Sequence, residues 1–205
     1  MSERKLSEAE ARRKQALEVL EAQMKEQGYE VKELKISALR ANVLAIVISA
    51  PFWIAALIPF IIIHGNPFAQ DYNALLFVLA MLAGIVIHEL IHGLTFAMFT
   101  EKGWKSIEFG ILWEYVTPYC TCSEPMKKGP MIVAAIMPTI VLGFVPAILG
   151  IITGKWVIMF FAIILIMGGG GDMMIIRNIL KYRSKGKEVL FLDHPYEIGT
   201  IAFEK

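Results

Sequence analysis

The sequence predicts an all-α membrane protein with four transmembrane helices, and three observations support this fold class. Hydrophobic residues make up 56% of the 205 residues, and the mean hydropathy of +0.57 is too high for an ordinary soluble domain. Four apolar segments each approach the roughly 20 residues that an α-helix needs to span a bilayer. Charged residues crowd the first forty positions, the stretch 101–128 and the tail after Arg177. Such a distribution is typical of a membrane protein, and it contains no basic field suited to nucleic acid.

A cytosolic N-terminal segment is expected over 1–40. Ser7 and Glu10 have the spacing of a capping box, which predicts a helix that ends near Gly28. Because its apolar stripe is narrow, we expect a surface helix that lies against the membrane or against the protein's own cytosolic face. A solvated, fully charged helix is the alternative. The residues 29–36 alternate loosely, as a short strand does.

The membrane domain is expected over 41–180, between the N-terminal segment and a cytosolic C-terminal tail over 181–205. The four spans are predicted at about 41–63, 74–99, 131–153 and 156–180. Lysines and arginines precede the first span, follow the second within the loop 100–130, and end the fourth. By the positive-inside rule, both termini and this loop are cytosolic, which predicts a multi-pass protein of the cell membrane.

The loop 100–130 contains its own pattern. Ile107, Phe109, Ile111, Trp113 and Tyr115 alternate with other residues before a Thr-Pro pair. This period of two predicts a strand or a short β hairpin near the cytosolic face of the membrane.

The second span contains His88-Glu89-Leu90-Ile91-His92, the HExxH pattern. On a helix, residues four apart lie on one face, so both imidazoles can bind one metal ion. The adjacent Glu89 can then hold and deprotonate a metal-bound water. The alternative is that these three side chains only form hydrogen bonds between helices.

The position of the motif within a membrane span favours a site. An ionised glutamate at mid-bilayer costs at least about 2.5–3.5 kcal/mol, so such residues usually serve the interior of a bundle. Ala80 and Gly84 precede His88 at four-residue steps. Because small residues let another helix approach closely, the histidine face is predicted to be the packing face.

Asp172 is the predicted third metal ligand. It is the acidic residue of the fourth span and follows four consecutive glycines, 168–171. Each glycine costs a helix about 0.8–1 kcal/mol relative to alanine, so four in a row indicate a local purpose, a close approach or a bend. His92 and Asp172 each lie about eight residues, roughly 12 Å, before the cytosolic end of their spans, and so reach one depth. The alternative is a glycine packing face with Asp172 paired to Arg177.

The remaining candidate ligands fit less well. His64 is expected at the outer membrane interface, and His194 in a turn of the tail. Cys120 and Cys122 are expected to be reduced and buried; together with both histidines they would instead make a closed structural zinc site. Glu188 or Glu197 would supply a glutamate third ligand from the cytosolic side, but neither is expected at the depth of His92.

The sequence resembles the site-2 protease class of intramembrane zinc proteases. More narrowly, it is similar to a small prokaryotic family of zincin peptidases catalogued as a domain of unknown function. The resemblance rests on HELIHG at 88–93, GGGGD at 168–172 and DHPYEIG at 193–199, and it covers most of the chain from about Tyr29. It implies a three-helix core with HExxH on the first core helix and an aspartate ligand on the third.

The resemblance also implies a zinc metalloendopeptidase that binds Zn²⁺ through His88, His92 and Asp172, with Glu89 as general base. Its substrate would be a membrane protein or transmembrane peptide within the lipid bilayer, in extended form against the 107–115 strand. The sequence departs from the family in two ways: Asp172 is followed by Met173 where well-known members have glycine, and no asparagine marks the middle core helix. A catalytically silent metal-binding scaffold or chaperone is the alternative function. A transporter is disfavoured because the first and third spans contain almost no ionisable residue.

Overall fold

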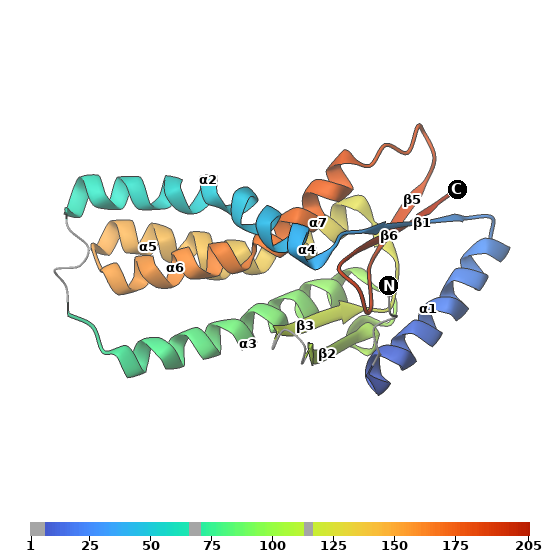
Figure 1. Ribbon diagram of the computed structural model, residues 1–205, viewed down its shortest axis with the longest axis horizontal. Helices are drawn as coiled ribbons and strands as arrows, with labels where there is room; N and C mark the ends of the chain where they lie inside the picture. Colours follow the sequence, from blue (N-terminus) through green and yellow to red (C-terminus); the bar gives the residue numbers. More distant parts are fainter. Residues whose placement is uncertain (1–6, 66–70, 113–116) are drawn as a thin grey trace.

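The protein is elongated, with its long helices at one end and its strands at the other, and both described ends of the chain, Ser7 and Lys205, belong to the strand end (Figure 1). A computed structural model describes residues 7–65, 71–112 and 117–205. The helices are α1 (Glu8–Glu26), α2 (Ala38–His64), α3 (Ala74–Phe99), α4 (Lys128–Pro138), α5 (Val145–Thr153), α6 (Trp156–Gly168) and α7 (Gly170–Lys181), with a 3-10 turn η2 (Gly103–Ser106) and a π-helical segment η3 (Thr139–Phe144). The strands are β1 (Glu30–Lys35), β2 (Ile107–Leu112), β3 (Thr117–Cys122), β4 (Met126–Lys127), β5 (Val189–Asp193) and β6 (Gly199–Glu204).

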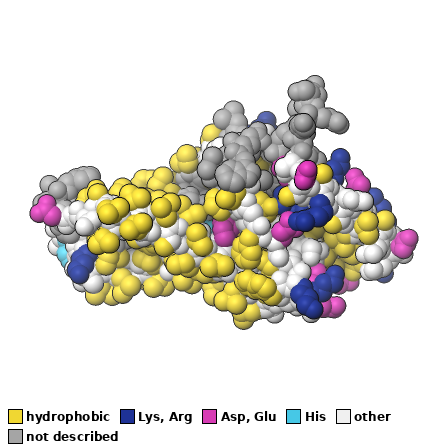
Figure 2. All heavy atoms as spheres, turned by 90° about the horizontal axis from the view of Figure 1, so that it is seen from below, with side chains coloured by type: hydrophobic (Ala, Val, Ile, Leu, Met, Phe, Trp, Pro, Cys, Tyr) yellow, Lys and Arg dark blue, Asp and Glu magenta, His cyan; other side chains and the backbone are white. Residues whose placement is uncertain are grey.

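Three helical stretches are long and apolar enough to cross a membrane, at Arg40–His64, Ala74–Phe99 and Lys128–Thr153. The pair α6 and α7 makes a fourth if its two helices, bent by 43° relative to each other, form one span. Hydrophobic side chains cover most of the helical end, while charged side chains gather mainly at the strand end (Figure 2). The prediction of a mostly helical protein with membrane-length apolar segments is therefore confirmed.

The third apolar stretch is one continuous rod made of α4, η3 and α5. Its π-helical turns begin directly after Pro138, whose ring nitrogen has no hydrogen to donate. Gly143 and Gly150 bring this rod close to α6, because a Cβ at Gly143 would lie 2.6 Å from Ile166 Cγ1 and one at Gly150 would lie 3.1 Å from the Met159 nitrogen. Small residues thus set the contact between the third and fourth stretches.

The helix α1 begins with the predicted capping box, in which the Glu10 amide donates to the Ser7 hydroxyl and the Ser7 amide donates to the Glu10 carboxylate. Its apolar stripe does not face solvent. Leu17 and Met24 are buried against β5 and β6. Of the expectations for this helix, packing against the protein itself is the one that the structure shows.

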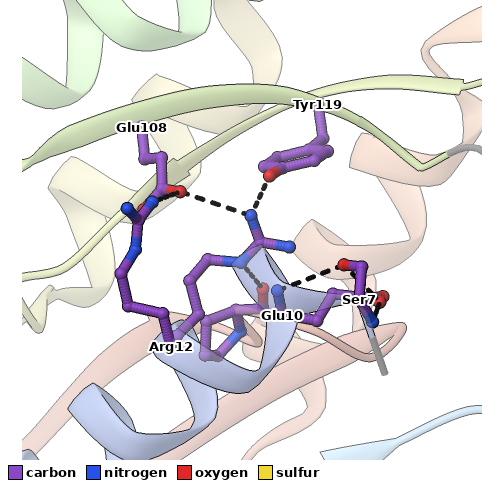
Figure 3. Close-up of polar contacts among 7 residues, drawn as sticks. Ser7, Glu10, Arg12, Glu108 and Tyr119 are labelled. Carbon is purple, nitrogen blue, oxygen red and sulfur yellow. Dashed lines mark hydrogen bonds and ion pairs between the residues drawn. The ribbon is translucent and has the colours of Figure 1, made fainter. Parts of the chain in front are cut away.

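Two arginines of α1 bind the β2–β3 hairpin (Figure 3). Arg12 forms an ion pair of 2.7 Å with Glu108 of β2. The buried Arg13 donates to the Tyr119 hydroxyl of β3 and to the Pro195 carbonyl oxygen at 2.6 Å. The guanidinium of Arg13 also lies 4.5 Å from the centre of the Tyr119 ring. Through these contacts α1 joins the hairpin to the chain that follows β5.

A four-stranded antiparallel sheet with the order β1-β6-β5-β4 stands at the end of the helices. The sequence predicts only a C-terminal tail over 181–205, so the pairing of β5 with β6 corrects the prediction for this segment. Every residue of β6 is buried, because α1 covers one face of the sheet and the ends of α3, α4 and α7 contact the other through Phe96, Met131 and Ile179. A strand buried on both faces lacks the alternation that marks a half-exposed strand.

The hairpin of β2 and β3 is confirmed, with Phe109 opposite Cys120 and Ile111 opposite Pro118. The predicted positions Trp113 and Tyr115 lie outside the described residues. The hairpin packs on the second span at Gly93, where a Cβ would collide with the Phe109 ring and lie 3.2 Å from Ile107 Cγ2. The glycine that follows HExxH therefore lets the hairpin lie directly on the helix that carries the motif.

Candidate metal centre

His88 and His92 come from one uninterrupted helix, α3, and their spacing places both rings on the same face. The ring centroids are 4.9 Å apart. His88 Nε2 lies 3.2 Å from Asp172 Oδ2, and His92 Nε2 lies 3.3 Å from Asp172 Oδ1. One donor atom from each of the three residues lies within 4.8 Å of the others. The structure thus brings together the three predicted ligands.

Asp172 reaches the histidines because the fourth stretch breaks at Gly169. A Cβ at Gly169 would collide with the Thr139 hydroxyl, and one at Gly170 would collide with the Ala45 carbonyl oxygen. Gly168 and Gly171 have open space where a side chain would begin. Two of the four glycines therefore let α7 settle against α2 and the middle rod, and this position directs Asp172 toward α3. The alternative pairing of Asp172 with Arg177 is not observed.

His92 is held in one orientation by a second contact. Its Nδ1 lies 2.9 Å from the Ala134 carbonyl oxygen. Since a carbonyl only accepts, Nδ1 carries the hydrogen and Nε2 is the nitrogen available to a metal. A hydrogen bond of this kind fixes the tautomer and the ring orientation of histidine ligands.

The donor set fits a zinc ion. With Zn–N near 2.0–2.1 Å and Zn–O near 2.0–2.2 Å, neighbouring ligands of a tetrahedral site are about 3.3–3.5 Å apart. The two nitrogen–oxygen separations of 3.2 and 3.3 Å are close to this spacing. The side chains of His88, His92 and Asp172 are only 13%, 9% and 19% exposed, so little solvent competes with a metal. Three protein donors leave a fourth position for water, as in catalytic zinc sites.

Glu89 lies beside the three donors and is not one of them. It lines a cavity of about 330 Å³ together with His88 of α3, Pro118 of β3 and Gly168 of α6. The backbone of Cys120 in β3 lies next to its carboxylate. This carboxylate therefore faces both the metal centre and the edge of β3, as a proton acceptor for a bound water would.

The other candidate ligands lie elsewhere. His64 contacts the Ile151 carbonyl oxygen at 2.7 Å, and His194 is a buried turn residue whose Nδ1 accepts from the Glu197 amide at 3.2 Å. Cys120 and Cys122 are free buried thiols, and burial raises the pKa of each. Within the described residues, the cluster that could hold a metal ion consists of His88, His92 and Asp172. None of His64, His194, the two cysteines, Glu188 and Glu197 belongs to it.

Asp193 is a further acidic residue near the centre that the sequence analysis did not single out as a site residue. It ends β5, and burial raises its pKa to about 7, with the nearby Asp172 and Glu89 carboxylates adding to the rise and His92 opposing it. It also lines a cavity of about 330 Å³ with Cys120 and His194. The DHPYEIG segment at 193–199 was the available signal, but only the pairing of β5 with β6 brings it to the metal centre.

Two histidines one turn apart on a helix, a carboxylate from a second helix and a glutamate beside them form a cluster that could hold a metal ion, a pattern that metallopeptidases share. The sequence model of the family described as "Putative zincin peptidase" matches residues 81–186, just over half of the chain. The chain belongs to this family, whose matched region includes all four residues. No curated protein and no solved structure matches the chain.

Proposed function

We propose that this protein is an intramembrane zinc metalloendopeptidase of the site-2 protease type, which hydrolyses peptide bonds in membrane protein segments. The observation that carries the proposal is the convergence of His88, His92 and Asp172 beside Glu89, with the histidines on a helix long enough to span a bilayer and the aspartate on α7, which reaches that length together with α6. The order of the elements also fits this class, with HExxH on α3, a middle rod over Lys128–Thr153, and the aspartate on α7.

The chemistry divides between metal and protein. A zinc ion bound by these donors would lower the pKa of its water toward 7 and polarise the scissile carbonyl. Glu89 takes the proton of the attacking water and returns it to the leaving amine. His92 would direct Nε2 at such an ion, because its Nδ1–H donates to the Ala134 carbonyl oxygen and fixes the ring.

The strand end is the cytosolic end in this proposal. The loop between α3 and α4 and the chain after α7 carry the lysines and arginines that the positive-inside rule places in the cytosol, and both described ends of the chain lie there (Figure 1). The metal centre then lies in the cytosolic half of the membrane, where water reaches it from the cytosol.

A substrate segment in extended form fits the edge of β3 better than the 107–115 strand. Pro118, opposite Ile111, has no amide hydrogen to pair with β2, and the backbone of Cys120 lies next to Glu89 of α3, so alternate residues of β3 direct their backbone polar groups away from β2. This edge borders the cavity that contains His88 and Glu89. Strand addition here would place a substrate backbone beside the metal centre.

A pair of proline substitutions tests the edge. Cys120→Pro removes the amide that faces Glu89, and Ile111→Pro places the same ring at the outer edge of the hairpin. The first should lower cleavage much more than the second, with zinc content equal in both. Equal cleavage by the two variants would exclude pairing at β3.

The experiment that tests the function is Glu89→Gln. An amide of the same shape cannot accept the proton, so the variant should fold, keep zinc and bind substrate, yet lose at least the 10²–10⁴-fold typical of a general base. Turnover of transmembrane peptides is measured with purified, zinc-loaded protein in liposomes. Full turnover by Glu89→Gln would remove the mechanism, and the metal-binding scaffold or chaperone would become the better account.

A further inference from the structure

A second apolar groove lies along the seam between α2 and α7, with walls that differ from those of the Glu89 cavity. It has a volume of about 370 Å³, which is within the range of ligand pockets. Phe52 of α2 and Phe144 of the middle rod meet edge to face in its wall, with ring centroids 5.9 Å apart. Met173 and Ile176 of α7 line the opposite side. The groove is therefore shaped by three separate helical elements, α2, the middle rod and α7.

Two cations stand at one end of this groove. Arg177 and Lys181 both line it, and residues four apart on a helix share one face. No acidic residue lines the groove. Within residues 7–65, 71–112 and 117–205, no ion pair is formed by either cation, in contrast to Lys32, Lys35 and Lys187, which have carboxylate partners. The groove is thus apolar along its length and positively charged without a counter-ion at its end.

We propose that this groove binds an anionic phospholipid of the cytosolic leaflet, with its acyl chain against Phe52 and Ile176 and its phosphate at Arg177 and Lys181. The inference rests on the membrane orientation proposed above. Basic pockets between transmembrane helices on the cytosolic side are suited to anionic headgroups. Charge complementarity selects the occupant, because an apolar helix would leave both cations unpaired, whereas a zwitterionic headgroup places its own cation beside the phosphate and carries no net negative charge to offset Arg177 and Lys181.

The proposed lipid site is distinct from the candidate metal centre but contacts the same helix. The Glu89 cavity is lined by α3, α6 and Pro118, none of which lines the groove. Met173, which lines the groove, directly follows Asp172. A lipid bound here would therefore lie along α7 and α2, whose close approach at Gly170 and Ala45 positions the aspartate.

Lipid binding by purified protein tests the inference without any need for hydrolysis. Native mass spectrometry measures the affinity for phosphatidylglycerol and for phosphatidylcholine in detergent. Each basic residue near an anionic surface contributes about fivefold to binding, so Arg177→Gln with Lys181→Gln should weaken phosphatidylglycerol binding by about 25-fold. Lys181→Gln alone, at an exposed position where packing is undisturbed, should weaken it about fivefold.

Matched controls separate this site from general charge and from the proposed peptidase. Lys102→Gln with Lys105→Gln removes the same charge at exposed positions outside the groove, and it should leave the affinity within about twofold. Glu89→Gln should bind phosphatidylglycerol like the wild type, so a failure of the peptidase proposal shows in turnover and leaves the lipid result unchanged. Wild-type affinity of the double Arg177/Lys181 variant, or equal binding of the two lipids by the wild type, would overturn the proposal.

Discussion

The two sides of the metal centre are built by different means. On the α3 side, an uninterrupted helix carries both histidines, and the i, i+4 spacing alone brings their rings to 4.9 Å. On the α7 side, Asp172 follows a bend of 43° and is correctly placed only because Gly169 and Gly170 admit Thr139 and the Ala45 carbonyl. Local helix geometry determines one half, and tertiary contact of the backbone determines the other.

This difference means that the two sides should respond differently to added bulk. A new methyl group on α3 meets side chains that can rotate away. A new methyl group at Gly170, in the α6–α7 bend, meets the backbone of Ala45, which moves only if a whole helix moves. We therefore expect metal affinity to be most sensitive to substitution of Gly170 and much less so to substitution of Gly93, the glycine after His92.

Gly170→Ala should have the largest effect among the glycine substitutions. Its Cβ would collide with the Ala45 carbonyl oxygen, so α7 must shift away from α2. Overpacking of this kind costs about 1–3 kcal/mol, and displacement of a ligand's support lowers metal affinity by about 10–100-fold. Thermal unfolding and zinc titration in detergent measure both quantities.

Gly171→Ala is the matched control, because its Cβ would meet open space. It should leave zinc affinity unchanged and raise the free energy of unfolding by up to about 1 kcal/mol, the gain in helix propensity. If the two alanine variants behave alike, the proposed role of close backbone contact at the bend is wrong.

Gly93→Ala on the other side should have a smaller effect. Its Cβ would collide with the tip of the Phe109 ring, and the hairpin can yield. We expect zinc affinity to stay within a few-fold of wild type while cleavage falls, because β3 is displaced from Glu89. Adding Phe109→Leu should restore cleavage by returning the space. A loss of zinc as large as that of Gly170→Ala would contradict the distinction between the two sides.

The smallest effect concerns the sheet, away from the metal centre. Hydrogen bonds from Lys32 and from the Tyr182 hydroxyl at 2.7 Å lower the pKa of Glu204 from 4.5 to about 2. Because the folded pKa is below the unfolded one, the ionised carboxylate stabilises the protein above about pH 4.5, and this contribution is lost as pH falls toward 2. Glu204→Gln should make the melting temperature less dependent on pH over that interval, and it should leave zinc affinity at neutral pH unchanged. An unaltered pH profile would show that these bonds add no stability.

The sequence is sufficient to predict those features whose structure is determined by local periodicity. The capping box at Ser7, the apolar stretches, the hairpin from Ile107 and the HExxH face follow from spacing within one element. Asp172 was also identified, because an acid after four glycines in a span is costly without a purpose. Which glycines make the close contacts could not be predicted, since that depends on Thr139 and Ala45 in other helices.

The sheet was missed for a related reason. The strand β6 is buried on both faces by α1 and the helix ends, so its sequence shows no alternation, and its partner β1 lies more than 160 residues earlier in the chain. Asp193 enters the neighbourhood of the metal centre only through this pairing. The burial of Leu17 and Met24 likewise depends on β5 and β6, which no local sequence pattern predicts.

The most direct test of the account is the zinc content of purified Asp172→Ala protein compared with wild type, measured by elemental mass spectrometry after equilibration at a fixed free zinc concentration. The wild type should contain one zinc ion per chain, and His88→Ala should lose it. His194→Ala, which removes a buried histidine outside the cluster, should retain the metal. We predict that Asp172→Ala loses zinc as His88→Ala does. Full zinc occupancy in Asp172→Ala would contradict the three-ligand centre on which the proposed function depends.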